Sequence, residues 1–481
     1  MGGCGCVCSK EKEEASRTLL PGAFAPLHTD INFKYRFLKT IGTGRYGKAS
    51  LAALKVMPSA QVVIKALHKK RVQVTKDTLE REIQTLFKFD HPYIARLFEV
   101  FEDSESVHLV TEHCSGEGLF EAIVAKGKFP EQEACGLIYK ILLVVNHLHH
   151  LNIVHRDLKP ENFMFEDSSP TADLKLIDFG LSNKIFAKMD HLEQKTIVGT
   201  PDYMAPETAQ GGHGSMCDLW SVGVIMYAML SGQLPFTART PDDTLERVMA
   251  GNYSVSSETW NKVSPQAIDL IGKLLVVDPR GRLTAATALK HEWFSQAPIR
   301  QPVSVPMLDA LRNYKTKTRF QAEAHRIITK FVNLAHSRDV KSTFLSLNKD
   351  NSGYLSSDEV RDGLREAGHT LEASEMEEIL RNVNFKQDGR ISYSDFLSSV
   401  MIPRALLDDD MLWCAFIFFD VDNTGVVDEG KVKEALQRVG RSMSQDEVHE
   451  MLITVESEEL GVDYGEFKKV VLQGSAAPRG R

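Results

Sequence analysis

Five short motifs follow one another between residues 41 and 223 of this 481-residue chain, and their order limits what the chain can fold into. A glycine-rich stretch, IGTGRYGKA, is followed by a β-branched run, VVIK, and this pattern predicts a strand, a glycine turn and another strand. The other four motifs are HRDLKPEN, DFG, APE and DLWSVG. A glycine-rich stretch alone is a weak signal, because dinucleotide-binding folds carry one too, but five motifs in this order leave little room for coincidence.

Residues 33–294 resemble a eukaryotic protein kinase on these motifs. The resemblance implies an α+β fold of two lobes that binds ATP and Mg²⁺ and transfers the γ-phosphate to a protein hydroxyl. The form HRDLKPEN is typical of serine/threonine rather than tyrosine specificity. Inactive relatives usually lack one of the residues that correspond to Lys65, Asp157 and Asp178, and all three are present here.

Five polar residues carry the expected chemistry, which is mostly positioning and charge neutralisation. By the resemblance, Asp157 accepts or steers the proton of the substrate hydroxyl, Lys159 neutralises the transferring phosphoryl group, and Thr200 touches the catalytic aspartate. Asn162 and Asp178 carry the oxygens expected to hold Mg²⁺, a hard ion that prefers such ligands.

The nucleotide is expected at the glycine-rich turn and the strands around it. Glycines there let the backbone approach the phosphates without a Cβ in the way, and Lys65 would hold the α- and β-phosphates. The spacing to the following His-Pro pair favours Glu82 over Glu80 as the acidic partner of Lys65. Thr111 takes the gatekeeper position, next to two residues that offer backbone bonds to adenine. The other residues expected around ATP are Ile41, Gly42, Gly44, Gly47, Ala49, Glu112 and Cys114.

Two departures from the family pattern bear on substrate choice and regulation. GEGLF stands where the family usually has GGELF, which displaces an acid that often contacts ribose or a basic substrate residue, while Glu161 remains as an acceptor. A preference for substrates with basic residues near the phosphosite is therefore expected, in weakened form. Thr196 is either an activating phosphosite that Arg156 would pair with, or an exposed loop threonine.

The first ten residues, MGGCGCVCSK, have three interpretations. Gly2 is placed for N-myristoylation and Cys4 and Cys6 for palmitoylation, although the motif wants Ser or Thr at position six. A CxCxC metal tract and a plain disordered tail are the alternatives. Because the nearby charges cancel and one myristoyl chain binds membranes only marginally, the cysteines would have to supply the second anchor. Residues 1–32 are therefore expected to be a lipidated tail.

Composition limits the partners and the compartment. A net charge of −8 argues against a nucleic-acid binder, since affinity there comes from neutralising phosphates with Lys and Arg. There is no run of 18 apolar residues and no secretory segment, and the seven cysteines suggest a reducing compartment. We expect an intracellular monomer, in the cytoplasm and on the cytoplasmic face of membranes, that acts on protein substrates.

Residues 295–336 are expected to form a linker and a junction. APIRQPVSVP marks the linker by its prolines, and the stretch after it has apolar residues at helical spacing. A basic amphipathic helix after a kinase domain suggests a pseudosubstrate-like autoinhibitor or a calmodulin-type target, and the alternative is an ordinary packed helix. Its basic residues are Arg312, Lys315, Lys317 and Arg319.

Residues 337–476 are expected to be all-α and calmodulin-like, with four EF-hands in two pairs that cover 337–402 and 410–476. Their loops begin at 348, 384, 420 and 455, a repeat of about 36 residues. The eighth loop positions are all apolar and can pair the loops across each lobe whether or not calcium is present. These residues are Leu355, Ile391, Val427 and Val462.

The four loops are unequal as calcium sites. The second loop has Lys386 in third place, and the fourth lacks the turn glycine. The third loop ends on Lys431, a cation where the last ligand of the ion belongs, so we expect it to bind calcium weakly or not at all. The ligands expected in the first loop are Asn348, Asp350, Ser352, Tyr354 and Glu359, and those of the third are Asp420, Asp422, Thr424 and Asp428.

A kinase, a basic junction and four EF-hands in this order resemble the calcium-dependent protein kinases of plants and protists. The resemblance covers nearly the whole chain after Phe33, and it implies a serine/threonine kinase that is inhibited by the junction and released by the calcium-binding region. Two alternatives are open. One is an active kinase whose EF-hand region is largely structural, and the other is a non-catalytic calcium-dependent scaffold.

Overall fold

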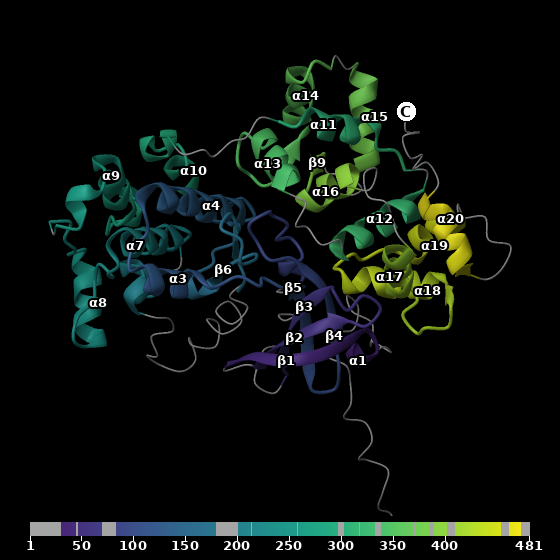
Figure 1. Cartoon of the computed structure of the whole chain (residues 1–481), viewed down its shortest axis with the longest axis horizontal. Coiled ribbons are helices and arrows are strands. Elements are labelled where there is room, and N and C mark those ends of the chain that lie inside the picture. Colours follow the sequence, from purple (N-terminus) through teal and green to yellow (C-terminus); the bar gives the residue numbers. More distant parts are fainter. Residues whose placement is uncertain are drawn as a thin grey trace, which may run out of the picture.

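The computed structural model shows an N-terminal lobe built on a sheet, a mostly helical C-terminal lobe, and a further helical region that packs against them (Figure 1). The residues that it describes are 30–44, 47–69, 83–178, 201–212, 214–256, 258–296, 303–316, 318–331, 338–369, 372–383, 389–401, 409–453 and 461–472.

The N-terminal lobe consists of a short helix and five strands: α1 (Ile31–Lys34), β1 (Tyr35–Gly44), β2 (Gly47–Leu54), β3 (Gln61–His68), β4 (Leu97–Glu102) and β5 (Ser106–Glu112). The strands form one antiparallel sheet in the order β1-β2-β3-β5-β4. The run VVIK lies in β3, one strand later than the sequence pattern indicated. The strand directly after the glycine turn, GKASLAAL, is rich in alanine, and the weak β propensity of alanine hid it in the sequence.

The C-terminal lobe surrounds helix α7 (Met216–Ser231), which is buried along nearly its whole length. Its other elements are α3 (Leu119–Lys126), α4 (Glu131–His150), β6 (Phe163–Phe165), β7 (Leu174–Leu176), α6 (Pro206–Ala209), α8 (Pro241–Ala250), α9 (Pro265–Leu274) and α10 (Ala285–Ala288). Local signals set the helix ends. Thr240 caps α8 through the N–H of Asp243, Pro241 occupies its first position, and Gly251 ends it with a φ of 62°.

One ion pair ties this lobe together. The guanidinium of Arg282 donates to both carboxylate oxygens of Glu207, at 2.7 and 3.0 Å, and also to the backbone carbonyls of Met216 and Val276. The Arg282 side chain is fully buried, so the bidentate carboxylate and the carbonyls replace its water shell.

The junction and the EF-hand region are helical, and each EF-hand loop contains a two-residue strand. The elements are α11 (Val305–Asn313), α12 (Arg319–Phe331), α13 (Arg338–Leu347), β8 (Leu355–Ser356), α14 (Ser357–Glu366), α15 (Ala373–Val383), β9 (Arg390–Ile391), α16 (Tyr393–Met401), α17 (Asp409–Phe419), β10 (Val426–Val427), α18 (Glu429–Arg438), α19 (Gln445–Ile453), β11 (Val462–Asp463) and α20 (Tyr464–Leu472). Leu355 pairs with Ile391 and Val427 with Val462, which confirms the prediction from the apolar eighth positions.

The junction helix α12 lies between the two EF-hand pairs, against α16 of the first pair and α17 and α20 of the second (Figure 1). Phe320 packs against the rings of Phe419 and Phe467, and the side chains of Gln321 and His325 bind the carbonyl of Val471 in α20. This packing is compatible with a calmodulin-type target and with an ordinary packed helix, two of the interpretations that the sequence left open.

The other face of α12 meets strand β4 and the residue before it. Arg96 donates to the carbonyl of Thr329 at 3.5 Å, and Lys330 donates to the carbonyl of Phe98 at 3.0 Å. One apolar cluster joins part of the buried side chains of the N-terminal sheet to those of α12 and of the second EF-hand pair. Within the described residues, no helix combines the length and apolar character needed to cross a membrane.

Candidate active site and calcium-binding loops

The buried side chain of Asp218 stabilises the loop that carries the expected catalytic residues. The carboxylate of Asp218 accepts hydrogen bonds from the backbone N–H groups of His155 and Arg156, at 3.0 and 2.8 Å. It also pairs with Nε2 of His149 at 2.8 Å. Burial alone would raise the pKa of Asp218, but these hydrogen bonds and the nearby histidines lower it, so the group is a buried carboxylate. Arg156 adopts a φ of 69°, a conformation that the Asp218 bond helps to stabilise.

The sequence pattern gave no role to Asp218, although it begins the DLWSVG motif. A carboxylate inside an otherwise apolar helix is the signal that could have identified it, because a buried charge requires partners.

The structure brings Asp157, Lys159 and Asn162 together. The Lys159 ammonium lies 3.3 Å from Oδ2 of Asp157, and Nδ2 of Asn162 donates to the backbone carbonyl of Asp157 at 2.6 Å. The carbonyl of Asn162 accepts from the N–H of Ile177 at 2.9 Å, which ties this loop to the residue before Asp178. The side chain of Asp157 is partly exposed and can therefore reach a substrate hydroxyl.

Lys65 and Asp178 form a second polar contact of the site. The Lys65 ammonium binds Oδ1 of Asp178 and the carbonyl of Ile177, both at 3.1 Å, and Nε2 of His155 bonds the carbonyl of Asp178 at 2.8 Å. Half of the Asp178 side chain is exposed, so its carboxylate is accessible to an ion. The residues present fit Mg²⁺-ATP: Asn162 and Asp178 supply oxygens, and Lys65 and Lys159 supply positive charge.

The glycine-rich strands show that their glycines serve different purposes. Gly42 and Gly44 face open space, which suits a close approach of phosphates. A Cβ on Gly47 would lie 1.7 Å from the carbonyl oxygen of Ala66, so Gly47 is required by the packing of β2 on β3. Ala49 pairs with Lys65 across the same two strands, and Ile41 is exposed on β1.

At the hinge, Thr111 is buried and donates to the carbonyl of Val63 at 3.2 Å. The carboxylate of Glu112 accepts two hydrogen bonds of 2.8 Å from Lys175. Burial would raise the pKa of Glu112, but Lys175 and Arg96 lower it to about 2. Cys114 is buried, and burial raises the pKa of its thiol to about 12, so it is not a reactive thiolate.

Several predicted site residues lie outside the described part of the chain. They are Gly2, Cys4, Cys6, Glu82, Thr196 and Thr200. Glu161 is described and is exposed next to the catalytic loop.

The first EF-hand loop folds around the amide of Asn348. Its Nδ2 donates to Oδ1 of Asp350 at 3.0 Å, to Oγ of Ser352 at 3.3 Å and to the carbonyl of Tyr354 at 2.7 Å. Oδ1 of Asn348 accepts from the N–H of Gly353 at 2.9 Å. A bound calcium ion would need the side-chain oxygen of Asn348, and this oxygen already accepts the hydrogen bond from Gly353. The residues of the first loop therefore fit calcium, but the ion has to compete with this internal hydrogen bond.

The expected bidentate ligand of this loop, Glu359, is also engaged. One of its oxygens accepts from the N–H groups of Lys349 and Asp350, and the other from the N–H and Oγ of Ser356. These bonds form a capping box at the start of α14.

The last residues of the other loops are paired with protein groups. Asp395, which ends the second loop, is buried and binds Arg326 of the junction helix. In the fourth loop, Asp463 and Glu466 cap each other's backbone N–H groups, at 3.1 and 2.9 Å. In the third loop the Lys431 ammonium lies among the groups expected to bind calcium, so these residues do not fit the ion.

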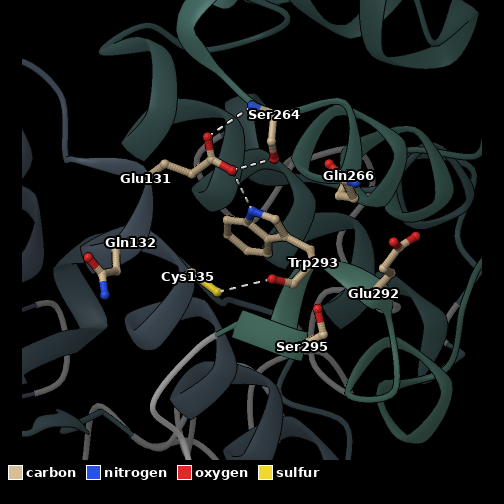
Figure 2. Close-up of a pocket in the computed structure, with 8 residues that line it drawn as sticks. All are labelled: Glu131, Gln132, Cys135, Ser264, Gln266, Glu292, Trp293 and Ser295. Atoms are coloured by element: carbon tan, nitrogen blue, oxygen red, sulfur yellow. Dashed lines mark hydrogen bonds between the residues drawn. The ribbon is translucent and has the colours of Figure 1, made fainter.

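A separate cavity of about 460 Å³ lies in the C-terminal lobe, between α4 and α9 (Figure 2). The carboxylate of Glu131 accepts from Ser264 and from the indole N–H of Trp293 there, and Cys135 donates to the carbonyl of Trp293. None of the predicted catalytic or ATP-binding residues lines this cavity. We assign it no part in phosphoryl transfer.

Comparisons with known proteins agree with this geometry. The protein kinase domain model matches residues 35–294, and the EF-hand domain pair model matches residues 338–401. The chain is 33% identical over 457 residues to calcium-dependent protein kinase 34 of Arabidopsis thaliana, covering 93% of this chain and 86% of the relative. It is 34% identical over 440 residues to calcium-dependent protein kinase 3 of Plasmodium berghei (strain Anka), covering 89% of this chain and 78% of the relative.

Half of the chain matches the kinase model, Asp157, Lys159 and Asn162 lie together, and the likeness to these relatives continues through the EF-hands. The chain is a protein serine/threonine kinase and belongs to the calcium-dependent protein kinase family.

Proposed function

We propose that this chain transfers the γ-phosphate of ATP to serine or threonine hydroxyls of proteins, and that calcium binding at the first EF-hand loop controls the transfer. The observation that supports catalysis is the cluster of Asp157, Lys159, Asn162 and Asp178 with Lys65. Bound Mg²⁺ would neutralise the phosphate charge. Asp157 is placed to take the hydroxyl proton, and the two lysines would hold the phosphates in position.

Calcium control is supported by direct bonds between the first loop and the end of α4. Nδ2 of Asn146 donates to the carbonyl of Asn351 at 2.7 Å, and Nδ1 of His147 bonds the carbonyl of Ser352 at 2.8 Å. Two residues after His147, His149 binds Asp218, which supports the catalytic loop. Binding of calcium would rearrange the loop carbonyls, and α4 would carry that change toward Asp157.

Ion pairs and hydrogen bonds also hold the first EF-hand pair on the kinase. Lys341 in α13 binds Asp173 at 2.9 Å and also binds Glu166, and Ser394 in α16 donates to the carboxylate of Asp90. The charges of Lys341, Asp173 and Glu166 are largely shielded from water, so these contacts are more than surface ion pairs.

Inhibition by the junction is the prediction that the family resemblance adds. Here α12 packs on α16, α17 and α20. In this arrangement the basic residues of the junction have acidic partners: Arg312 pairs with Glu375 and Lys315 with Glu378. Without calcium, the same basic residues are available to acidic groups near the catalytic loop such as Glu161.

The exposed Glu161 also supports a preference for substrates with basic residues near the phosphosite. Attachment to membranes through Gly2, Cys4 and Cys6 stays a prediction from the sequence.

Transfer of radiolabelled phosphate from ATP to a basic serine peptide tests this function. Wild-type protein should be more active with calcium than with a chelator. Asp178→Ala should be inactive in both conditions because it removes a Mg²⁺ ligand. Glu359→Gln should keep the activity seen in chelator and lose most of the stimulation. Equal activity with and without calcium would favour a structural EF-hand region, and transfer by a folded Asp178→Ala protein would contradict the assigned site.

A further inference from the structure

The Lys431 side chain ends at the centre of the third EF-hand loop. Its Nζ lies 3.2 Å from Oδ1 of Asp420, 2.5 Å from Oδ1 of Asp422 and 2.6 Å from the carbonyl oxygen of Val426. It also donates to Oγ1 of Thr424. These four groups occupy loop positions one, three, five and seven, which are the positions that bind calcium in an EF-hand.

We propose that the Lys431 ammonium is a built-in substitute for calcium, which keeps the third loop closed and the second EF-hand pair docked on the kinase without metal. Two carboxylates and two neutral oxygens surround a single positive charge, the ammonium of Lys431, which is the twelfth residue of the same loop. A calcium ion would have to displace the Lys431 ammonium, which is part of the chain and cannot diffuse away. The loss of the ammonium's bonds to Asp420 and Asp422, and the repulsion between the ammonium and the ion, both oppose calcium binding.

The loop backbone has the turn that a closed EF-hand requires. Asp420 accepts from the N–H groups of Thr424 and Gly425, at 3.1 and 2.8 Å. Asn423 and Gly425 have φ values of 55° and 83°, close to those of 55° and 82° at Asn351 and Gly353 in the first loop. β10 also pairs with β11 of the fourth loop.

The charges in the third loop favour this arrangement. Burial would lower the pKa of Lys431, but the hydrogen bonds that its ammonium donates to Asp422 and Asp420, and the charges of these carboxylates, raise it. The Lys431 side chain is 11% exposed, so little water competes for the ammonium.

The two helices that flank the third loop hold the second EF-hand pair against the N-terminal lobe. Phe418, at the end of α17, lies 4.5 Å below the ammonium of Lys34. Arg438, at the end of α18, lies 5.3 Å from the ring of Phe101 in β4. A closed loop fixes α17 and α18 relative to each other, and so it fixes both of these contacts.

In the first loop a nitrogen also occupies the centre, but it holds the loop less strongly because it carries no charge. There the nitrogen at the centre belongs to the neutral amide of Asn348, which can turn to present an oxygen. The two EF-hand pairs therefore have different roles: the first pair responds to calcium, and the second pair stays docked on the N-terminal lobe with or without calcium. This division refines the proposed calcium control, but the docking itself does not depend on that control.

Hydrogen exchange of the full-length chain, read by mass spectrometry, tests the proposal without using kinase activity. In chelator, wild-type peptides that cover loop 420–431 and strand β4 should be protected, and calcium should change their exchange less than twofold. Lys431→Met should raise exchange in both peptides about tenfold or more, because the acidic loop has lost its counter-charge. Lys433→Met, two residues later and with only a 3.5 Å contact to Gln445, should behave as wild type.

Lys431→Glu supplies the complementary test, since it restores a carboxylate at the twelfth position. This variant should exchange quickly in chelator, recover protection when calcium is added, and bind one more ion than wild type in calorimetry. The proposal is wrong if Lys431→Met keeps wild-type protection in chelator, or if calcium protects the wild-type loop further. If both variants fail to fold, calorimetry of the wild type alone decides, because an ion bound in the third loop contradicts the proposal.

Discussion

Asp218→Asn changes one buried carboxylate beneath the catalytic loop and leaves its volume almost unaltered. The carboxylate is 1% exposed and serves three donors, the N–H groups of His155 and Arg156 and the imidazole of His149. An amide keeps a single acceptor oxygen, so its NH₂ group must face at least one of these donors. Losing one hydrogen bond to a charged group costs about 1.5–3 kcal/mol.

The lost hydrogen bond would loosen the backbone of His155 and Arg156, which directly precede Asp157. A displacement of about 1 Å at a catalytic group lowers the rate roughly 100-fold. The bonds between Lys65 and Asp178 are made elsewhere, so binding of ATP should be little affected. We therefore expect a kcat about 100-fold lower with a nearly unchanged KM for ATP.

Steady-state phosphorylation of a basic peptide, with calcium present, measures both constants. Asp242→Asn, in the exposed first turn of α8, is the matched control and should keep wild-type kinetics. Circular dichroism melts establish that each variant is folded. A folded Asp218→Asn protein with a wild-type kcat would refute the role given to this carboxylate.

The ion pair of the C-terminal lobe predicts that Glu207→Ala, which leaves the buried Arg282 guanidinium without its carboxylate, lowers the free energy of unfolding by about 3–5 kcal/mol in a denaturant titration. An unchanged midpoint would contradict this. Acid should weaken the protein in a defined range, because the pKa values of Glu112 and Asp173 are lowered to about 2 in the folded state. The stability they contribute is complete above a pH of about 4.5 and is lost as the pH falls toward 2, and melts of wild type and Glu112→Gln across that range should converge at the acidic end. Gly2→Ala should move the protein from the membrane fraction to the supernatant after cell fractionation, and equal recovery with wild type would reject the lipid anchor.

The sequence was sufficient for features that depend on local spacing. The kinase motifs identified the residues that meet around Asp157, and the apolar eighth positions predicted which EF-hand loops pair. Each of these predictions uses residues whose roles are fixed within one short motif. The alanine-rich strand β2 was less visible, because its formation depends on neighbouring strands rather than on its own propensity.

Contacts between distant segments could not be read from the pattern. Lys341 reads as an ordinary surface lysine, yet it is buried against Glu166 and Asp173, which lie about 170 residues earlier. The sequence indicated that Lys431 disables a calcium site. It could not show that the ammonium reaches back to Asp420 and Asp422, because the length and flexibility of a lysine side chain allow many other positions.

The apolar cluster shared by the N-terminal sheet, α12 and the second EF-hand pair has a consequence for folding cooperativity. Sequence motifs divide the chain into an enzyme and a regulator, but the buried side chains do not follow that division. Phe98 and Phe101 of the kinase are covered together with Phe320 and Phe418 of the regions after it. A kinase domain expressed alone would expose this surface to water, so the N-terminal lobe and the second EF-hand pair should unfold as one unit.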